Sequence, residues 1–220
     1  MATYRTYEAE LNPEKALIFR IVHLSNVPWI LDNGLHCGNS VVNRNPQWVT
    51  IGNADLTARR AQHLIPKPNA GFLNDYVPFY FTPFSPMLLN IKSGRSGVPK
   101  RPNSEIVILV SSLRKIAQQQ LSYWFTDAHA YVAYANFFND LDDLHRIDWE
   151  ILQRRDFARD LADLNKMERY QAEALVHQHV PVTALLGIVC YTEEVRKQLQ
   201  LAVAQRQLEL KVLSKSGWYF

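Results

Sequence analysis

The sequence predicts an α+β fold, formed by residues 1–220 as a single domain. Short apolar runs rich in β-branched or aromatic residues occur near the start, in the middle and near the end of the chain, with helical patterns between and around them. No linker, repeat or low-complexity tract divides the chain. Hydrophobic residues make up 47% and charged residues 20%, so a chain of this length can bury a core without disulfides or metals.

In the first half, three runs have the composition of strands, and we expect the last two to lie in one core sheet: 16–22, 76–82 and 105–111. Two short helices are predicted between them, at 25–34 and 55–63. Pro28 lies in the first turn of the first helix and Gly34 ends it. Residues 38–70 are predicted as a loop-rich insertion around the second helix, favoured by turn-forming residues at Asn43, Asn45 and Pro46.

In the second half, three helices are predicted from capping residues, at 128–139 after Asp127, at 149–157 after Asp148, and at 192–206. Two apolar runs predict strands near the end, 185–191 and 208–213. Residues 170–180 fit a helical and an extended period equally well at this length, so the pattern leaves their structure undecided.

Charge is distributed unevenly although the formal net charge is only +3. Residues 76–104 contain no acid, and a predicted surface loop at 92–102 carries the basic cluster Lys92, Arg95, Lys100 and Arg101. The charged residues of 140–168 are mostly acidic, and we expect polyanions to avoid that side. This polarity suits a nucleic-acid or nucleotide phosphate ligand on one face. A solvated loop that aids solubility explains the charge alone equally well.

Several function classes are excluded. Cys37 and Cys190 are too few for a disulfide framework or a thiolate zinc site and suit a reducing compartment. The start lacks a signal-peptide core and no stretch approaches the roughly 20 apolar residues of a membrane span, so a cytoplasmic location is expected. The seven histidines lack metal-site spacing, and no metal is expected. Motifs of P-loop, Rossmann and serine hydrolase enzymes are absent, and Cys190 is interpreted as an inert core thiol.

A few polar residues lie in apolar surroundings and are candidates for chemistry. Glu173 stands in the run Tyr-Gln-Ala-Glu-Ala-Leu-Val, where a carboxylate needs a partner; a catalytic role and a salt bridge to an arginine both meet this need. His129 follows the expected cap Asp127 and suits either a site or a structural hydrogen bond. Arg60 at the end of a short helix can serve a site or simply satisfy terminal carbonyls.

Three long motifs occur in register: Asp-Tyr-Val-Pro-Phe-Tyr-Phe-Thr-Pro-Phe-Ser-Pro-Met-Leu at 75–88, Trp-Phe-Thr-Asp-Ala-His-Ala at 124–130, and Arg-Tyr-Gln-Ala-Glu-Ala-Leu-Val at 169–176. In these motifs, in residues 21–35 and in residues 216–220, the chain resembles the DarT family of DNA ADP-ribosyltransferase toxins, over essentially its whole length. The resemblance implies the ADP-ribosyltransferase fold related to PARP-like enzymes, with a split β-sheet. It also implies NAD as co-substrate, a thymine base of single-stranded DNA as acceptor, no metal, and a macrodomain antitoxin of the DarG type as partner. We expect a monomer.

Matching motif to motif carries the catalytic roles to Glu173, Arg60 and His129. The same comparison assigns NAD binding to residues on the first predicted strand, around the helix that follows it and in the motif at 75–88: Arg20, Val22, His23, Asn26, Gly34 and Tyr80. Many relatives have His where Arg20 stands and Thr where Val22 stands, and some have Arg in place of Phe84. Because the Tyr-Gln-Ala-Glu run is intact, the chain is expected to be active.

DNA binding is expected from cations and from side chains that contact bases: Arg59, Lys92, Arg95, Lys100 and Arg101, with Trp48 and Tyr76 as exposed stacking aromatics and Met87 beside them. The insertion at 38–70 is expected to lie over the NAD cleft and to help form the DNA groove, with residues 43–48 at the substrate site. Two alternatives stay open at this stage: an ADP-ribosyltransferase that acts on RNA, protein or water, and a non-catalytic binder of single-stranded nucleic acid.

Overall fold

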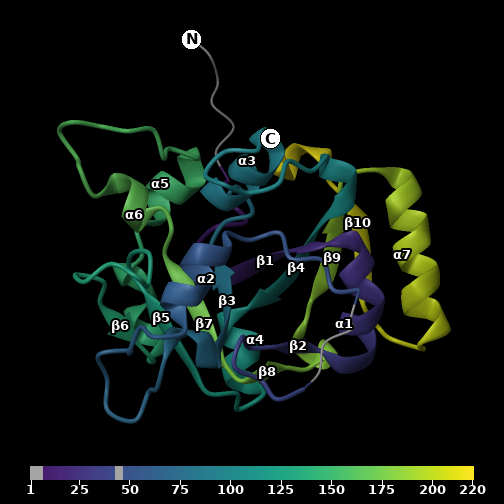
Figure 1. Ribbon diagram of the computed structural model, residues 1–220, viewed down its shortest axis with the longest axis horizontal. Helices are drawn as coiled ribbons and strands as arrows, with labels where there is room; N and C mark the ends of the chain where they lie inside the picture. The colour runs from purple at the N-terminus through teal and green to yellow at the C-terminus, as the bar shows by residue number, and fades with distance from the viewer. Residues whose placement is uncertain (1–6, 43–46) are drawn as a thin grey trace.

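The chain folds around one large mixed sheet, seen in a computed structural model that describes residues 7–42 and 47–220 (Figure 1). Eight strands follow the order β10-β9-β4-β1-β3-β7-β5-β6. Their bounds are β1 Leu17–His23, β3 Tyr76–Tyr80, β4 Ile106–Ser112, β5 Tyr123–Thr126, β6 Phe137–Phe138, β7 Glu173–His177, β9 Gly187–Cys190 and β10 Lys211–Ser214. Neighbouring strands are antiparallel except β9 and β10, which are parallel. The predicted α+β class is confirmed.

The sheet is split between β1 and β3. β1 pairs with β4 along its whole length, from Leu17↔Ser112 to His23↔Ile106. With β3 it shares a single pair, Phe19↔Tyr80. Pro78 in β3 has no N–H for a ladder, and its carbonyl accepts a side-chain bond from Arg20 Nη1 at 2.7 Å. The two strands therefore separate beyond Phe19, and their facing edges are left for side chains.

Seven α-helices surround the sheet: α1 Val27–Asn33, α2 Ala54–Arg60, α3 Pro86–Ser93, α4 Leu113–Gln118, α5 Trp149–Arg154, α6 Lys166–Arg169 and α7 Glu193–Gln205, counted over the described residues. Figure 1 shows α7 beside β9 and β10 at one end, and α5 and α6 at the other end near β5. A second, two-stranded sheet pairs β2 (Leu35–His36) with β8 (His179–Val180). The hydrophobic core includes side chains from both parts of the split sheet, and β4 is buried at every position.

Most predicted elements of the first half are confirmed. The strands expected at 16–22, 76–82 and 105–111 are β1, β3 and β4, and they share one sheet, with β1 between the other two. The helix predicted at 25–34 is a 3-10 turn (Leu24–Asn26) followed by α1, which ends at Gly34 with φ 76°. The helix predicted at 55–63 is α2, shorter at its end. The predicted loop residues Asn43, Asn45 and Pro46 lie outside the described residues.

Most of the corrections fall in the second half. The helix predicted at 128–139 is wrong: these residues form turns and the strand β6, because Asp127 accepts hydrogen bonds from the Asn136 backbone N–H and side-chain amide instead of capping a helix. The helix after Asp148 ends at Arg154, since Arg155 adopts φ 55°. Residues 170–180, left undecided, contain β7 and β8. The predicted basic loop at 92–102 begins inside α3, and α3, α4 and β5 were not predicted.

The remaining predictions near the end of the chain hold with shifted limits. The helix at 192–206 is α7, capped by Thr192, whose hydroxyl accepts from the Val195 N–H at 3.2 Å. The run 185–191 contains β9, and the strand predicted at 208–213 is β10, which begins at Lys211. Further 3-10 turns lie at Leu73–Asp75, Asn103–Glu105, Leu141–Arg146, Val182–Ala184 and Ser216–Trp218. Within residues 7–42 and 47–220, no helix has the length and apolar character needed to cross a membrane.

Candidate active site at the split of the sheet

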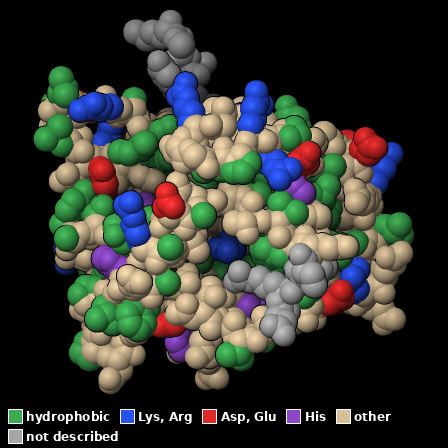
Figure 2. All heavy atoms as spheres, in the orientation of Figure 1, with side chains coloured by type: hydrophobic (Ala, Val, Ile, Leu, Met, Phe, Trp, Pro, Cys, Tyr) green, Lys and Arg blue, Asp and Glu red, His purple; other side chains and the backbone are tan. Residues whose placement is uncertain are grey.

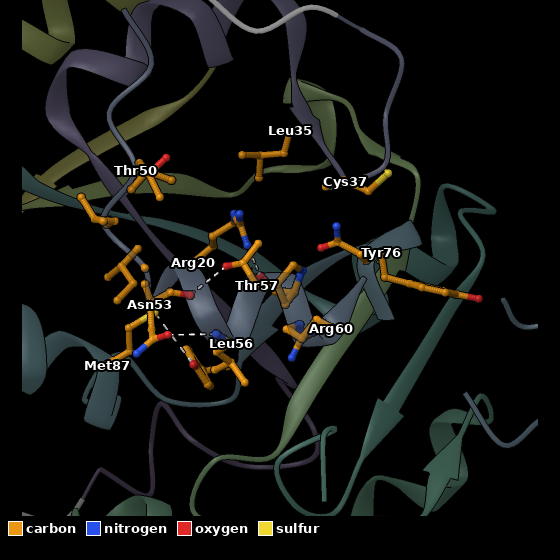
Figure 3. A pocket seen from close by; sticks show the side chains of 18 of the residues that line it. Arg20, Leu35, Cys37, Thr50, Asn53, Leu56, Thr57, Arg60, Tyr76 and Met87 are labelled. Carbon is orange, nitrogen blue, oxygen red and sulfur yellow. Dashed lines mark hydrogen bonds between the residues drawn. The ribbon is translucent and has the colours of Figure 1, made fainter. Parts of the chain in front are cut away.

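A cavity opens where β1 and β3 separate. Its walls come from β1, β3, the start of β7, the α2 helix and the segment before α2, and residue His129. Figure 2 shows a hollow near the centre of this face with a basic side chain at its floor, and Figure 3 shows Arg20 and Arg60 among the residues that line the cavity. Segments distant in sequence thus bring several polar side chains to one place.

Glu173 is the charged group at the centre of this site. It is the first residue of β7, opposite Tyr80 of β3, and it is 2% exposed. Arg60 Nη1 lies 3.1 Å from one carboxylate oxygen (Oε1) and 3.0 Å from the other (Oε2). The Ala130 backbone N–H donates to Oε1 at 3.0 Å. The buried carboxylate is therefore held by an arginine on one side and by a backbone amide on the other.

These partners decide the protonation of Glu173. Burial alone would raise the pKa of a carboxyl, but the charge of Arg60, the nearby His129 ring and the hydrogen bonds from Arg60 and Ala130 together hold the pKa of Glu173 below its ordinary value of 4.5. Glu173 is thus a carboxylate at neutral pH. Its negative charge in turn adds to burial in raising the pKa of the nearby Tyr80 hydroxyl, which stays protonated.

Arg60 reaches the site because α2 ends there. Asn53 caps the helix by accepting the Leu56 N–H at 2.9 Å, which fixes where α2 starts. Arg60 in the last turn is buried, while Arg59 beside it faces solvent. Nη1 of Arg60 contacts Glu173, and Nη2 is buried without a hydrogen-bond partner among the described residues. The contact with Glu173 therefore explains the position of Arg60 without the alternative role of satisfying helix carbonyls. The Nη2 group stays available to a ligand.

His129 lies in the turn after β5. Its Nδ1 accepts the Tyr131 backbone N–H at 3.1 Å and lies 3.7 Å from Glu173 Oε1. Because Nδ1 is an acceptor, the proton of the neutral ring resides on Nε2. Its backbone N–H donates to the Glu168 carbonyl at 2.8 Å. The predicted structural hydrogen bond and the predicted place at the site therefore both describe His129.

The residues expected to bind NAD divide into two groups. Arg20, Val22, His23, Asn26 and Tyr80 line the cavity. The Asn26 amide holds the segment over the site, with its Nδ2 donating to the Val49 carbonyl at 2.8 Å and its Oδ1 accepting the Val49 N–H at 2.9 Å.

Gly34 is the exception in this set, because it does not line the cavity. A Cβ at this position would lie 2.4 Å from His179 Nε2 and 2.6 Å from the Val180 carbonyl. Glycine is needed there for the turn from α1 into β2, which packs against β8.

The residues expected to contact DNA also fall into two groups, those that line the cavity and those that lie outside it. Trp48, Tyr76 and Met87 line the cavity. The expectation that Tyr76 is an exposed stacking aromatic is wrong: it is 5% exposed, and its hydroxyl donates to the Ala70 carbonyl at 2.7 Å. Trp48 is half-buried and packs edge-on against Trp29, with ring centroids 5.5 Å apart.

The predicted basic residues do not reach the cavity itself. Lys92, Lys100 and Arg101 line a separate surface hollow with Tyr191, and Arg95 is exposed. Two contacts connect this region to the cavity. Asn53 Nδ2 donates to the Ser96 carbonyl at 2.9 Å. Glu105 accepts from Arg101 and contacts His23 Nε2, both at 3.3 Å. The basic ridge, defined here as Lys92, Arg95, Lys100 and Arg101, therefore lies next to the mouth of the site.

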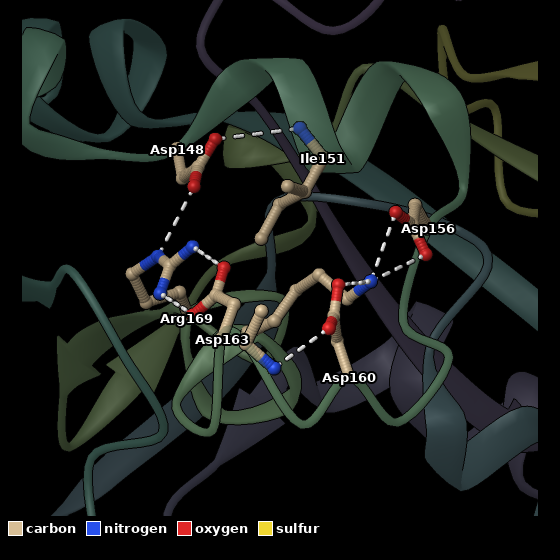
Figure 4. Close-up of polar contacts among 8 residues, drawn as sticks. Asp148, Ile151, Asp156, Asp160, Asp163 and Arg169 are labelled. Carbon is tan, nitrogen blue, oxygen red and sulfur yellow. Dashed lines mark hydrogen bonds and ion pairs between the residues drawn. The ribbon is translucent and has the colours of Figure 1, made fainter.

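The acidic segment, which we expected polyanions to avoid, contains several ion pairs. Arg169 binds Asp163 through both terminal nitrogens at 2.8 and 2.7 Å and Asp148 through Nε at 3.1 Å. Lys166 lies 3.0 Å from Asp156 and 3.5 Å from Asp160 (Figure 4). The Arg169 guanidinium lowers the pKa of Asp163. Much of the acidic charge is thus neutralised in ion pairs that hold the loop between α5 and α6, just before Glu173.

Thr126, Ala130 and Asn53 were missed as contributors to the site. Thr126 and Ala130 lie in the motif at 124–130, so their proximity to His129 was a usable signal. The Ala130 contact is made by a backbone amide. Every residue except proline has one, so the residue type does not indicate such a contact. Over the described part of the chain, no cluster of three or more His, Cys, Asp or Glu side chains is arranged to hold a metal ion.

Comparison with protein families identifies residues 19–220 as a match to the family "ssDNA thymidine ADP-ribosyltransferase, DarT". A DNA ADP-ribosyl transferase of Escherichia coli O127:H6 is 58% identical over 97% of this chain and 98% of its own length. A DNA ADP-ribosyl transferase of Thermus sp. (strain 2.9) is 34% identical over 98% of this chain and 99% of its own length.

Solved structures give the same result. Thermus sp. 2.9 DarT in complex with ADP-ribosylated ssDNA matches with a TM-score of 0.85 and 31% identity, over 99% of this chain and 100% of that one. The same protein in complex with NAD+ matches with a TM-score of 0.78 and 30% identity, over 94% and 99% of the two chains. Thermosipho africanus DarTG in complex with ADP-ribose, 18% identical, shares the fold with a TM-score of 0.73, over 93% of this chain and 51% of that one.

Proposed function

We propose that this chain, which belongs to the DarT family of ssDNA thymidine ADP-ribosyltransferases, transfers ADP-ribose from NAD+ to a thymine base of single-stranded DNA and releases nicotinamide. The observation that carries the proposal is the buried, ionised Glu173 held by Arg60 and Ala130 at the floor of a cavity in the split sheet. The substrates in this proposal are inferred from relatives with the same fold, since a fold alone does not determine which substrates an enzyme uses.

The NAD+ side of the cavity is assigned to β1 and the segment over it. Arg20, Val22, His23 and Tyr80 would line the nicotinamide and ribose region, and Asn26 would act indirectly by holding the Val49 backbone. Figure 3 shows Arg20 and Thr50 among the side chains that line the same cavity. The insertion before α2 would thereby close over the dinucleotide, with Trp48 packed on Trp29 as its anchor.

Glu173 would act mainly through its charge. When the bond between C1′ of the ribose and nicotinamide breaks, the bonding electrons leave with nicotinamide and positive charge develops on the sugar. A preorganised carboxylate in a water-poor cavity stabilises that charge and can accept a hydrogen bond from a ribose hydroxyl. The low pKa of Glu173 suits this task, because the group is already ionised when substrate arrives.

The acceptor then forms the new bond. A thymine ring nitrogen attacks C1′ and gives up its proton, which passes to Glu173 and from there to water. Arg60 Nη2, the buried N–H without a partner among the described residues, would donate to the thymine oxygen on which negative charge develops. His129 would present its Nε2–H to the substrates while its Nδ1 stays on the Tyr131 amide. Extended single strands suit this chemistry, because the ring nitrogen is exposed only in an unpaired base.

The DNA backbone is assigned to the basic ridge beside the cavity mouth, with Arg59 and Met87 nearer to the acceptor base. We further propose that the chain works as a monomeric toxin, counteracted by a macrodomain antitoxin of the DarG type. The support for this partner is the family membership and the motifs at 75–88, 124–130 and 169–176.

Incubation of the chain with labelled NAD+ and separate pools of single-stranded DNA, duplex DNA, RNA and protein tests the proposal. We expect label on thymidine-containing single strands, and a loss of about 100-fold or more in Glu173→Gln, because the substitution removes the charge with little change in shape. Glu193→Gln, which removes a carboxylate of an exposed ion pair on α7, should act like the parent. Label on RNA or protein alone, or full transfer by Glu173→Gln, would contradict the assignment.

A further inference from the structure

The Thr126 hydroxyl occupies a position between the two segments that carry the site residues. Thr126 is the last residue of β5, and the β5–β7 register, with Phe125 opposite Ala174, places it opposite Glu173. It is completely buried. Its Oγ1 donates to the Ala128 carbonyl at 2.6 Å and accepts the Glu173 backbone N–H at 3.1 Å. A buried hydroxyl costs stability unless it is hydrogen-bonded, and this one uses both its donor and an acceptor position.

These two bonds join the start of β7 to the turn that bears His129. The turn is fixed to Glu173 a second time, through the Ala130 N–H and the carboxylate Oε1 at 3.0 Å. These contacts form a closed ring. One side runs from the Thr126 hydroxyl through Ala128 to Ala130. The other side runs from the Glu173 carboxylate through the Glu173 backbone N–H back to Thr126. The geometry of the carboxylate relative to His129 therefore depends on an atom that itself does not line the cavity.

We propose that Thr126 is a positioning residue of the transfer reaction: its hydroxyl sets the Ala130 amide and the His129 ring relative to the Glu173 carboxylate. Without the hydroxyl, the Ala128 carbonyl and the Glu173 N–H lose a shared partner and the turn can move away from Oε1. A shift of about 1 Å in such a group costs on the order of 100-fold in rate. The proposal rests on the function proposed above.

The experiment compares Thr126→Val, which keeps the shape and removes the hydroxyl, with Thr126→Ser, which keeps the hydroxyl, using NAD+ and a thymidine-containing single-stranded oligonucleotide. We expect Thr126→Val to lower kcat by about 10- to 100-fold with KM for NAD+ changed by less than about threefold. Thr126→Ser should stay within about threefold of the parent. If Thr126→Val does not fold, Thr126→Ala replaces it, with the same expected loss.

Thr82→Val is the matched control, since Thr82 is likewise buried, at 1% exposed, and its hydroxyl accepts the Phe84 N–H at 3.2 Å and not the Glu173 N–H. It should lose stability to a similar extent and keep its kcat. A pH profile adds a readout that stability alone does not move. The groups facing Glu173 are Arg60 and His129, with Tyr80 beside them. Loss of the Ala130 bond raises the pKa of the carboxyl, so the acid limb of the Thr126→Val rate profile should shift to higher pH.

Three results overturn the inference: unchanged kcat in Thr126→Val, equal losses in the Val and Ser variants, or an equal loss in Thr82→Val. Each of these leaves the proposed function intact as long as the parent chain labels the oligonucleotide. Failure of the parent chain to label any thymidine-containing strand instead defeats the proposed function itself, so the two failures are distinguishable.

Discussion

At the scale of single residues, burial of the Glu173–Arg60 pair has a large desolvation cost, although the contacts of Glu173 keep its pKa low despite that burial. Both side chains are about nine-tenths buried or more, with 3% and 10% of their surface exposed. Such pairs often add little net stability compared with apolar residues, whereas removal of one partner leaves an uncompensated charge. A fixed carboxylate at the site thus comes with lower local stability of the fold.

Arg60→Gln should therefore destabilise the chain by about 3–5 kcal/mol near neutral pH. In the parent, the pKa of Glu173 lies below the ordinary value of 4.5, so its stabilisation is present above that value and is lost as pH falls through the folded pKa. In Arg60→Gln, burial acts with less opposition and raises the pKa, and the penalty is relieved by protonation as pH falls. Urea unfolding at about pH 7.5 and about pH 5 should give the larger difference at the higher pH.

Arg206→Gln is the control for this measurement. Arg206 also binds a carboxylate through two nitrogens, at 2.6 and 2.8 Å from Asp32, but this pair lies near the surface. Its removal should cost about 0–1 kcal/mol. Equal losses in the two variants, or a loss in Arg60→Gln that grows on acidification, would show that Glu173 is not held ionised by Arg60.

The sequence identified Glu173, Arg60 and His129 as candidates because they stand out against their surroundings or lie in motifs. It gave no means to pair them, since Arg60 and Glu173 are brought together only by α2 crossing to β7. The Tyr76 prediction failed for a related reason. An aromatic residue at a strand start has no local signal for exposure, and its burial follows from the 61–75 segment, where Ala70 accepts its hydroxyl.

At the scale of elements, the loop between α5 and α6 is ordered by ion pairs instead of regular structure. The two helices are only six and four residues long, too short to be stable alone. Arg169 fixes α6 to Asp148 at the start of α5 and to Asp163 in the loop (Figure 4). Because the Glu168 carbonyl accepts the His129 N–H, the order of this loop extends to the site.

Arg169→Lys should loosen this loop while it keeps the charge, because an ammonium group cannot bind Asp148 and Asp163 with the planar geometry of a guanidinium. Hydrogen exchange of the amides in 156–170 should become faster by on the order of tenfold, with a smaller loss of transfer activity. Arg154→Lys, in an exposed pair with Glu150 on α5, should leave exchange in the loop unchanged. Parent-like exchange in Arg169→Lys would show that the pairs do not order the segment.

Two of the errors, the helix predicted at 128–139 and the unpredicted strand β5, lie next to each other in the chain. Strong caps do not create helices when a better partner is present, and Asp127 binds Asn136 nine residues later. The four residues of β5 give too short a pattern to distinguish a strand from a helix. By contrast, α7 was predicted closely, because thirteen residues with a cap and one buried stripe provide a complete local signal.

At the scale of the whole molecule, the split sheet and the basic ridge form one working face. The split supplies a polar cavity in the middle of an apolar core, and Asn53 and Glu105 connect its mouth to the ridge. Figure 2 shows lysine and arginine side chains above the central hollow. The ion pairs of the acidic segment leave less free negative charge to oppose an approaching strand. A strand that follows the ridge would thus place a base at the cavity.

The ridge makes a prediction that separates DNA affinity from chemistry. The double variant Arg95→Gln/Lys100→Gln removes two exposed cations of the ridge. Each phosphate contact to a single strand contributes about 0.7 to the slope of log affinity against log salt, so the slope should fall by about 1.4 while KM for NAD+ stays the same. Arg146→Gln/Arg154→Gln lowers the net charge equally on the acidic segment and should keep the parent slope. A parent-like slope in the ridge variant, with weakened binding in the control, would place the strand on the other side of the molecule.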